Sequence, residues 1–365
     1  MKVFSYYLPQ FHPDEMNDLF WGENFTDWVT TKNAVPLFKG HKQPLLPADL
    51  GYYDLRSVDV LDRQAKLAKR YGVDGFAFYH YIFDAETSSL DTPIKNLRNN
   101  PHIDIDYFLC WVNADWTKAW IGDDYTFLYK QSYDDLTLKK LVEDACWHFA
   151  DNRYFKIDGK PLFYIHDPMR VDFNEFKRMF LKYSSLMGFP NVLFAAPDIH
   201  SYANQKSELD YLFGYPPGDF SFISMKIHIL YRKILEKLKN KDFFNEYFKF
   251  ASSFSYSKYV RDYSNYIFKK STKTKYIPTI LSGWDNTARY SHRGFLFDDF
   301  NSKYFREQSI NAFNMCKKYN KDFFMIKAWN EWAEGNVLEP SMYYGNSILE
   351  SFHDAKKIFL NNQIN

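Results

Sequence analysis

Hydrophobic and polar positions along the chain repeat in one order: a short apolar run, a polar loop rich in aromatic residues, and a segment with helical spacing. Short apolar runs bounded by polar residues predict buried strands. These runs lie at residues 3–8, 73–79, 107–112, 161–165, 192–196, 211–214, 276–281 and 323–328. Apolar side chains at positions 58, 61, 65 and 68 predict a helix over 58–71 that ends at Gly72, and further helices are predicted over 136–149 and 173–187.

Strands that alternate with helices predict parallel pairing, because each crossover returns the chain to the same edge of the sheet. Eight such strands can close into a barrel, which leaves no open edge. The expected fold class is therefore α/β, a (β/α)8 TIM barrel, in which residues 1–365 form a single domain.

Residues 219–275 interrupt the alternation between the sixth and seventh strands. They contain 11 Lys and 2 Arg against 3 Asp and 2 Glu, a net charge of +8. Apolar residues at 223, 227, 230, 234 and 238 share one helical face, which predicts a folded helical insertion. Two interpretations stay open: a solvated helical subdomain, or a surface for an anionic partner such as an acidic membrane face or a lipid-linked glycan.

The composition indicates a cellular compartment and limits the classes of possible partner. Charge is balanced, with 46 basic and 45 acidic residues, so a nucleic-acid partner is excluded. Three cysteines without paired spacing argue against a disulfide framework or a zinc site. Because no run approaches the ~18 apolar residues of a membrane span, we expect a cytoplasmic protein, peripheral to the inner membrane face if the insertion binds lipid. Aromatic residues form 20% of the chain, which predicts a ligand groove, and the oligomeric state stays open.

Familiar cofactor motifs are missing from the sequence. It has no G-x-G-x-x-G, P-loop or H-E-x-x-H pattern, so we predict neither a cofactor nor a catalytic metal. Asp104 and Asp106 form the acidic pattern that holds a divalent ion in many nucleotide-sugar transferases. This pair precedes the third strand, so we interpret it as a turn at the end of the barrel opposite the active site.

Candidate ligand-binding residues follow from the barrel, because the active site of this fold lies at the C-terminal ends of the strands. The residues there are mostly aromatic or neutral hydrogen-bonding side chains, which favours an uncharged, polyhydroxylated ligand over a phosphate. His166, Asp167, Asp198 and Tyr215 belong to this strand-end set. The residues predicted to bind substrate are Gln10, His12, Trp28, His80, Tyr81, Trp111, Asn113, Trp116, Trp284, Asp285, Asn286, Trp329, Asn330 and Trp332.

The strongest chemical signal is the pair Glu331 and Glu334, which directly follows the last apolar run. Glycoside hydrolysis uses two carboxyl groups, one of which protonates the leaving oxygen while the other assists attack. Residues three apart on a turn have Cβ atoms ~5–6 Å apart, which fits a retaining enzyme. The flanking indoles have flat apolar faces suited to sugar rings. The structural alternative is one Glu in a buried pair and one on a solvated loop.

With these residues in place, the chain resembles the WbsX-like proteins of surface-polysaccharide gene clusters, whose domain is related to glycoside hydrolase family 99. The matching segments are YLPQFHP at 7–13, PLFKGHKQPLLPADLGYYDLR at 36–56, YGVDGFAFYHYIF at 71–83, FLCWVNADWT at 108–117, GWDNTAR at 283–289 and AWNEWAEG at 328–335. The resemblance implies a (β/α)8 barrel that acts on glycans.

In family 99 a W-x-E-W-x-E motif supplies both carboxylates of a retaining endo-mannosidase that is thought to work through a 1,2-anhydrosugar. Carried over, the resemblance implies that Glu331 deprotonates the sugar 2-hydroxyl and that Glu334 is the acid/base at the glycosidic oxygen. Three functions stay open: a glycosidase that acts on an internal linkage, a glycosyltransferase of surface-polysaccharide assembly, and a non-catalytic glycan-binding barrel.

Overall fold

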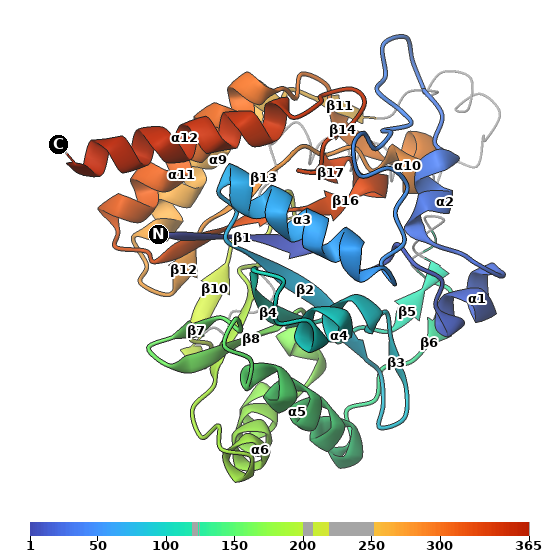
Figure 1. Cartoon of the computed structure of the whole chain (residues 1–365), viewed down its shortest axis with the longest axis vertical. Helices are drawn as coiled ribbons and strands as arrows, with labels where there is room; N and C mark the ends of the chain where they lie inside the picture. Colours follow the sequence, from blue (N-terminus) through green and yellow to red (C-terminus); the bar gives the residue numbers. More distant parts are fainter. Residues whose placement is uncertain (119–122, 124, 200–206, 219–251, 365) are drawn as a thin grey trace, which may run out of the picture.

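A computed structural model of the protein describes residues 1–118, 123, 125–199, 207–218 and 252–364. Its centre is a ring of parallel strands (Figure 1), ordered β12-β10-β9-β8-β4-β2-β1-β15-β13. The strands are β1 (Lys2–Tyr7), β2 (Gly75–Ile82), β4 (Asp106–Trp111), β8 (Lys160–Ile165), β9 (Leu193–Pro197), β10 (Tyr211–Phe213), β12 (Tyr276–Ile277), β13 (Thr279–Leu281) and β15 (Phe323–Lys327). The predicted (β/α)8 barrel is confirmed.

The seventh predicted strand is divided at Pro278 into β12 and β13. Proline has no N–H to donate to a ladder, so regular pairing is interrupted at that position. β12 pairs with β10 and β13 pairs with β15, so the two short strands together close the ring. The carbonyl of Pro278 still accepts a hydrogen bond of 2.9 Å from the backbone N–H of Met325.

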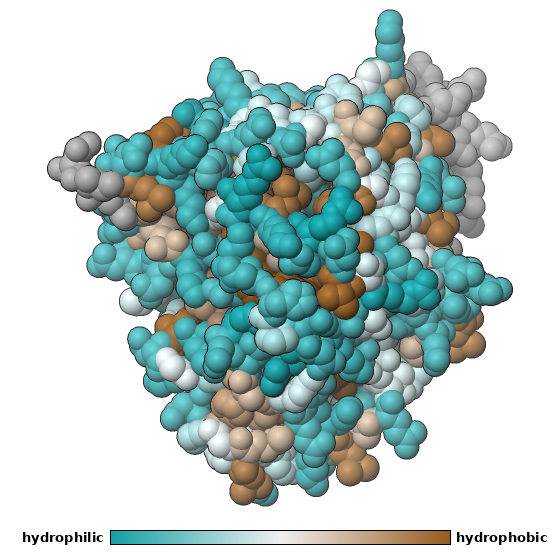
Figure 2. Space-filling view, in the orientation of Figure 1, coloured by the Kyte–Doolittle hydropathy of each residue, from teal (hydrophilic) through white to brown (hydrophobic). Residues whose placement is uncertain are grey.

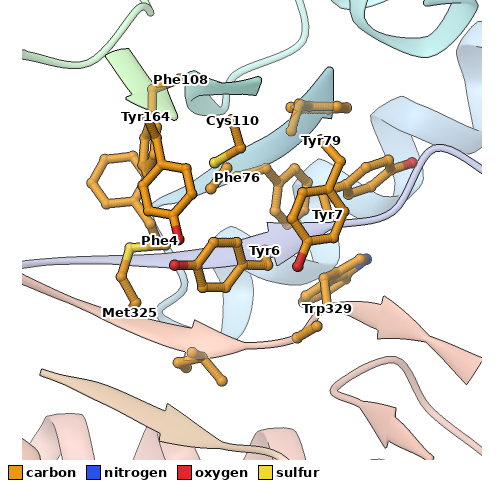
Figure 3. Close-up of a cluster of buried hydrophobic side chains, with 14 of the residues drawn as sticks. Phe4, Tyr6, Tyr7, Phe76, Tyr79, Phe108, Cys110, Tyr164, Met325 and Trp329 are labelled. Carbon is orange, nitrogen blue, oxygen red and sulfur yellow. The ribbon is translucent and has the colours of Figure 1, made fainter. Parts of the chain in front are cut away.

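Aromatic side chains fill the barrel interior (Figure 3). The ring of Phe4 packs 5.3 Å from that of Phe108 and 4.5 Å from that of Phe155, centroid to centroid. Gly75 pairs with Phe4 across the sheet, and a Cβ at position 75 would stand 2.4 Å from the Phe4 ring. This close approach explains why a glycine begins β2.

Helices cover the outside of the ring (Figure 1). The three predicted helices are confirmed as α3, α5 and α6, and Gly72 ends α3 in the left-handed conformation with φ 91°. The long helices are α3 (Val58–Tyr71), α4 (Thr92–Asn99), α5 (Asp135–Phe149), α6 (Phe173–Leu186), α9 (Tyr256–Ser271), α11 (Ser302–Lys318) and α12 (Ser347–Ile364). The face in Figure 2 is mostly hydrophilic, as expected when apolar side chains lie between the helices and the barrel.

Shorter elements decorate the loops. Those at the ends of the barrel are α1 (Glu15–Trp21), α2 (Asp27–Lys32), α10 (Thr287–Tyr290), η2 (Pro168–Arg170), η5 (Ser291–Arg293), η6 (Trp332–Glu334), β3 (Ser88–Ser89), β5 (Trp116–Thr117), β6 (Phe127–Tyr129), β7 (Lys156–Ile157), β11 (Ser252–Phe254), β14 (Phe295–Phe297), β16 (Asn330–Glu331) and β17 (Asn336–Val337). We call the C-terminal end of the barrel strands, where η6 and α10 lie, the mouth.

The predicted basic insertion is described only in its last part. Residues 219–251, with the five apolar positions of its expected helical face, lie outside the described residues. The remainder forms β11 and α9, and α9 buries Tyr259, Tyr263 and Ile267 as a barrel helix. The described part of the predicted insertion is therefore not a separate subdomain, because α9 is part of the regular outer layer.

Asp104 and Asp106 lie at the start of β4, at the end of the barrel opposite the mouth, as predicted. Lys2 pairs with Asp106 at 2.6 Å and Lys69 pairs with Asp104 at 3.1 Å, so both carboxylates hold surface ion pairs. In the described part of the chain, no helix combines the length and apolar character that crossing a membrane requires.

Candidate active site

The chain turns sharply after β15 and brings Glu331 and Glu334 to the mouth. Glu331 ends β16, and the single turn of η6 places Glu334 beyond it. Gly335 ends that turn with φ 58°, and a Cβ there would stand 2.8 Å from the Cβ of Asp285. The backbone N–H of Asp285 donates to the Glu334 carbonyl at 2.6 Å, so the loop after β13 is held against η6.

The two carboxyl groups, which we call the Glu pair, are hydrogen-bonded to each other, and Glu331 is buried while Glu334 is largely buried, with 15% of its side chain exposed. Burial and the neighbouring Glu334 charge raise the pKa of Glu331 to about 8. Burial also acts to raise the pKa of Glu334, but the charges of Arg289 and Lys327 and the bond from Glu331 outweigh it, so the pKa of Glu334 is lowered. At neutral pH the pair therefore holds one proton, on Glu331, and one charge, on Glu334.

Three side chains on other elements complete the surroundings of the pair. Arg289 on α10 donates to Glu334 Oε1 at 2.6 Å and approaches the buried Asp27 at 3.5 Å. The hydroxyl of Tyr79 on β2 donates to Glu331 Oε1 at 3.1 Å. Lys327 ends β15, and its ammonium lies 4.1 Å from the centroid of the Tyr215 ring.

These contacts reverse one expectation for the free protein. The resemblance implies an ionised Glu331 as base and a protonated Glu334 as acid. In the unliganded structure the cation Arg289 contacts Glu334, whereas the neutral Tyr79 hydroxyl contacts Glu331. A cation favours the charged form of a carboxyl and burial favours the neutral form, so the proton lies on Glu331.

Trp329 and Trp332 were predicted to stack on sugar rings, and the structure contradicts this. Both indoles are fully buried, and each donates its Nε1–H at 2.9 Å to the buried carboxylate of Glu339. Glu339 also accepts bonds from the Tyr53 hydroxyl at 2.7 Å and from Gln64 Nε2 at 2.6 Å. The indoles thus support the Glu pair from within the protein, because they anchor the chain before and after Glu331 to one carboxylate.

Asn330 also has a supporting role. Its amide accepts from the backbone N–H of Leu8 at 2.8 Å and donates to the Leu8 carbonyl at 3.0 Å. Trp28, on α2, is buried against Trp332 and donates its Nε1–H to the Tyr53 carbonyl at 2.8 Å. Neither side chain presents a free surface to a ligand, so the predicted binding role of both is wrong.

Two further predicted residues face the helical layer instead of the mouth. His80 Nε2 lies 2.8 Å from a carboxylate oxygen of Asp144 on α5. The Trp111 indole stacks on Phe176 of α6, with ring centroids 5.6 Å apart. Successive strand residues point to opposite faces, and both of these point outward.

Polar residues of the predicted set hold loops together. Asn113 binds both backbone groups of Asp167, at 2.7 and 2.8 Å. Asn286 accepts from the backbone N–H of Phe295 at 2.8 Å. Gln10 donates to Asn17 at 2.9 Å. These three side chains therefore shape the loops around the mouth.

Of the remaining predicted residues, Tyr81 and Trp284 have contacts that tie them to the surroundings of the Glu pair. The Glu331 charge, after burial, raises the pKa of Tyr81, and the Tyr81 ring packs 5.7 Å from that of Trp116. Trp284 lies 5.2 Å, ring centroid to ammonium, from Lys327. His12 is buried, and burial lowers its pKa.

Asp285 positions the loop that carries Arg289. One of its carboxylate oxygens lies 2.8 Å from His41 Nε2, and the other accepts from the Thr287 hydroxyl at 2.6 Å. His41 Nδ1 accepts the backbone N–H of Leu37 at 3.0 Å, so Nε2 carries the hydrogen that points to Asp285.

Sequence reasoning gave no role to Lys327, Arg289, Tyr79 or Glu339, because it collected residues that follow the strands. Tyr79 and Lys327 lie within strands, and Lys327 is a charged residue inside an apolar run, which is the signal that could have found it. Arg289 closes the GWDNTAR segment. The mouth thus holds two cations, Arg289 and Lys327, beside its aromatic and neutral side chains.

Comparison with known proteins identifies relatives over nearly the whole chain. The family described as glycosyltransferase WbsX matches residues 3–352. The uncharacterized protein WxcX of Xanthomonas campestris pathovar campestris strain B100 is 30% identical over 375 residues, which cover 96% of this chain and 49% of that protein. The chain thus spans about half the length of the curated relatives it matches.

Solved structures share the fold. A family 99 endo-alpha-mannosidase from Bacteroides thetaiotaomicron superimposes with a TM-score of 0.60, at 13% identity, over 99% of this chain and 98% of that one. A glycoside hydrolase-like protein superimposes with a TM-score of 0.59, at 14% identity, over 97% and 93% of the two chains. At such identities the likeness is one of fold.

Proposed function

The chain belongs to the WbsX glycosyltransferase family, and on that premise we propose that it cleaves, or transfers at, an internal glycosidic linkage of a cell-surface polysaccharide or its precursor. Family membership and the barrel fold support a carbohydrate-active enzyme. The finer proposal is a retaining reaction through Glu331 and Glu334. The observation that supports it is the buried, hydrogen-bonded Glu pair, which holds one proton and one charge.

An acid/base reaction needs this protonation state, because one group must accept a proton while the other donates one. In the proposed first step, Glu331 takes the proton of the sugar 2-hydroxyl and O2 attacks C1. The bond from C1 to the leaving oxygen breaks, and Glu334 protonates that oxygen. In the second step, Glu334 takes a proton from the acceptor as the acceptor opens the 1,2-anhydrosugar, and Glu331 returns its proton to O2.

These roles require the proton of the free pair to move from Glu331 to Glu334 when substrate binds. The hydrogen bond between the two carboxyl groups supplies a direct path for that transfer. A sugar hydroxyl that donates to Glu331 favours its charged form and thereby drives the transfer.

The second candidate is a glycosyltransferase that uses an activated sugar. Two observations favour it: the description of the family, and the cations Arg289 and Lys327 at the mouth, which could interact with phosphate. Both candidates use the Glu pair, and they differ in the donor and in the acceptor.

Product analysis tests the proposal. Bacterial surface polysaccharides and nucleoside diphosphate sugars are each incubated with the protein, with and without an added oligosaccharide acceptor, and products are identified by mass spectrometry. Cleavage or transfer within a polysaccharide chain, lost in Glu331→Gln and Glu334→Gln, supports the proposal. Products from nucleoside diphosphate sugars alone support the transferase. Products that persist in both variants overturn the assignment of the Glu pair.

A further inference from the structure

Lys327 differs in its setting from other buried lysines. It is 4% exposed, and it shares its strand face with Phe323 and Met325, so its side chain caps the interior of the barrel at the mouth. The ammonium lies 4.1 Å from the ring centroid of Tyr215, whose hydroxyl is its hydrogen-bond partner. The charges of the Glu pair act to raise the pKa of Lys327, but Lys327 forms no ion pair with any carboxylate of the described residues.

Two other lysines show how burial is usually compensated in this protein. Lys270 pairs with the buried Asp198 at 2.8 Å. Lys321, just before β15, donates to the carbonyls of Lys273 and Thr274 at 2.7 Å each. A buried ammonium is costly unless it is paired, and Lys327 has neither a carboxylate nor a pair of carbonyls.

A second buried donor, the indole N–H of Trp284, lies beside Lys327. Trp284 is 9% exposed, and its Nε1–H has no hydrogen-bond partner among the described residues. The Lys327 ammonium lies 5.2 Å from the centroid of the Trp284 ring. The ammonium has the Tyr215 hydroxyl as a partner, and the indole N–H has no partner among the described residues, so both donors have N–H bonds left for the acceptor oxygens of a ligand.

We infer that Lys327 and Trp284 form a subsite for a sugar that bears an anionic group, either the carboxylate of a uronic acid or a phosphate ester. The inference rests on the proposed action on glycans and specifies the substrate class. Oxygen atoms of such a group accept from both donors, and the ring of Tyr215 or Trp284 offers an apolar surface for the sugar. The anion completes the ion pair that Lys327 lacks in the free protein.

Binding without turnover tests the subsite separately from the reaction. The full chain with Glu331→Gln, which mimics the protonated residue, is applied to bacterial surface polysaccharides in three forms: native, with carboxyl groups reduced to alcohols, and dephosphorylated. Uridine diphosphate glucose and glucose form a further matched pair of probes. We expect about 10- to 100-fold tighter binding of an anionic form than of its neutral counterpart. If reduction of the carboxyl groups abolishes binding, the anionic group is a uronic acid carboxylate. If dephosphorylation abolishes binding, it is a phosphate ester.

Variants of Lys327 test whether this residue causes the preference for anionic forms. Lys327→Gln, added to Glu331→Gln, should bind anionic and neutral forms alike, and Lys327→Arg should keep most of the preference. Lys321→Gln is the matched control: it removes a buried lysine near the other end of β15 and should leave the preference unchanged.

Four outcomes would overturn the inference: equal binding of charged and neutral forms, neutral binding only, binding of none of the probes, or a preference that survives in Lys327→Gln. The comparison of the two ligand forms holds even if a Lys327 variant fails to fold. A failure of the proposed reaction appears in product analysis, not in this assay.

Discussion

Glu339 and the Glu pair lie in one stretch, residues 331–339, but their charges are compensated in different ways. Glu334 accepts from the cation Arg289 at 2.6 Å, and its pKa is lowered. Glu339 accepts four hydrogen bonds, all from uncharged side chains, and burial still raises its pKa to about 7. Glu331, whose donor is Tyr79, has a pKa of about 8.

This comparison shows what holds a charge inside the barrel. Neutral donors reduce the effect of burial on a carboxyl group, while a cation reverses it. The supporting carboxyl Glu339 is enclosed by donors that fix its neighbours, whereas the Glu pair combines one cation-bound group with one group that keeps its proton. The second arrangement places a proton and a charge on adjacent carboxyl groups at neutral pH, which acid/base catalysis requires.

The largest effect is expected from the pair itself. Glu331→Gln and Glu334→Gln should each reduce turnover by about 10²–10⁴-fold, because each removes one proton-transfer group. A substrate with an activated leaving group needs no proton, so it should restore part of the rate of Glu334→Gln but not of Glu331→Gln. Steady-state kinetics with natural and activated substrates measure both. If the activated substrate restores the rate of Glu331→Gln instead, Glu331 is the acid and Glu334 the base, in agreement with their protonation in the free protein.

The next largest effect is expected on stability, from the loss of the cation Arg289. Arg289→Gln leaves Glu334 and Asp27 buried without their partner, so we expect a loss of about 3–5 kcal/mol in the free energy of unfolding. Denaturant titration measures it. Arg178→Gln is the matched control, because its pair with Glu175 is exposed and its loss should change the free energy of unfolding far less. Similar losses in both variants would contradict the importance of burial.

The neutral cluster should show a smaller effect. Glu339→Gln is isosteric, but its NH2 group must face a donor such as an indole N–H, so we expect about 1–3 kcal/mol of destabilisation. Turnover should fall because the indoles that flank the pair lose their anchor. Glu307→Gln, at an exposed position of α11, should change stability by about 0.5 kcal/mol or less. Unchanged stability and turnover in Glu339→Gln would rule out the anchoring role.

The last effect is a pH dependence, which is spread over several pH units and is the smallest per unit of change. The folded-state pKa of Glu331, about 8, is above its ordinary value of 4.5, so the folded protein binds this proton more tightly than the unfolded chain. The resulting stability is complete below about pH 4.5 and is lost as pH rises to about 8. Wild type should therefore lose stability relative to Glu331→Gln over this window, by less than about 1.4 kcal/mol per pH unit. Parallel curves from denaturant titrations would show that Glu331 is ionised in the folded state.

Much of this architecture was predictable, and the errors have a common physical cause. The helix 58–71 and the eight strands follow from hydrophobic periodicity, and the position of Glu331 and Glu334 follows from the end of the last apolar run. Strands of a parallel barrel are buried on both faces, so their sequences are apolar throughout and do not reveal which residues point inward. His80 and Trp111 were therefore assigned to the mouth although they face helices.

The roles of Trp329 and Trp332 could not be predicted for a different reason. Their partner Glu339 is close in sequence, but Tyr53 and Gln64, which complete the cluster, come from the first crossover. Only the folded barrel brings these segments together. The same holds for Arg289, whose contact with Glu334 spans 45 residues.

The bond between Asn330 and Leu8 joins residues 322 positions apart, and it has a consequence for how the protein is made. The first strand leaves the ribosome early and must wait for the last strand before its edge is covered and the ring can close. Contacts of such long range slow folding, because the chain must lose much of its freedom before they form. The Glu pair therefore becomes organised only after the last strand of the barrel has been made, and a chain that stops short of β15 has no assembled Glu pair.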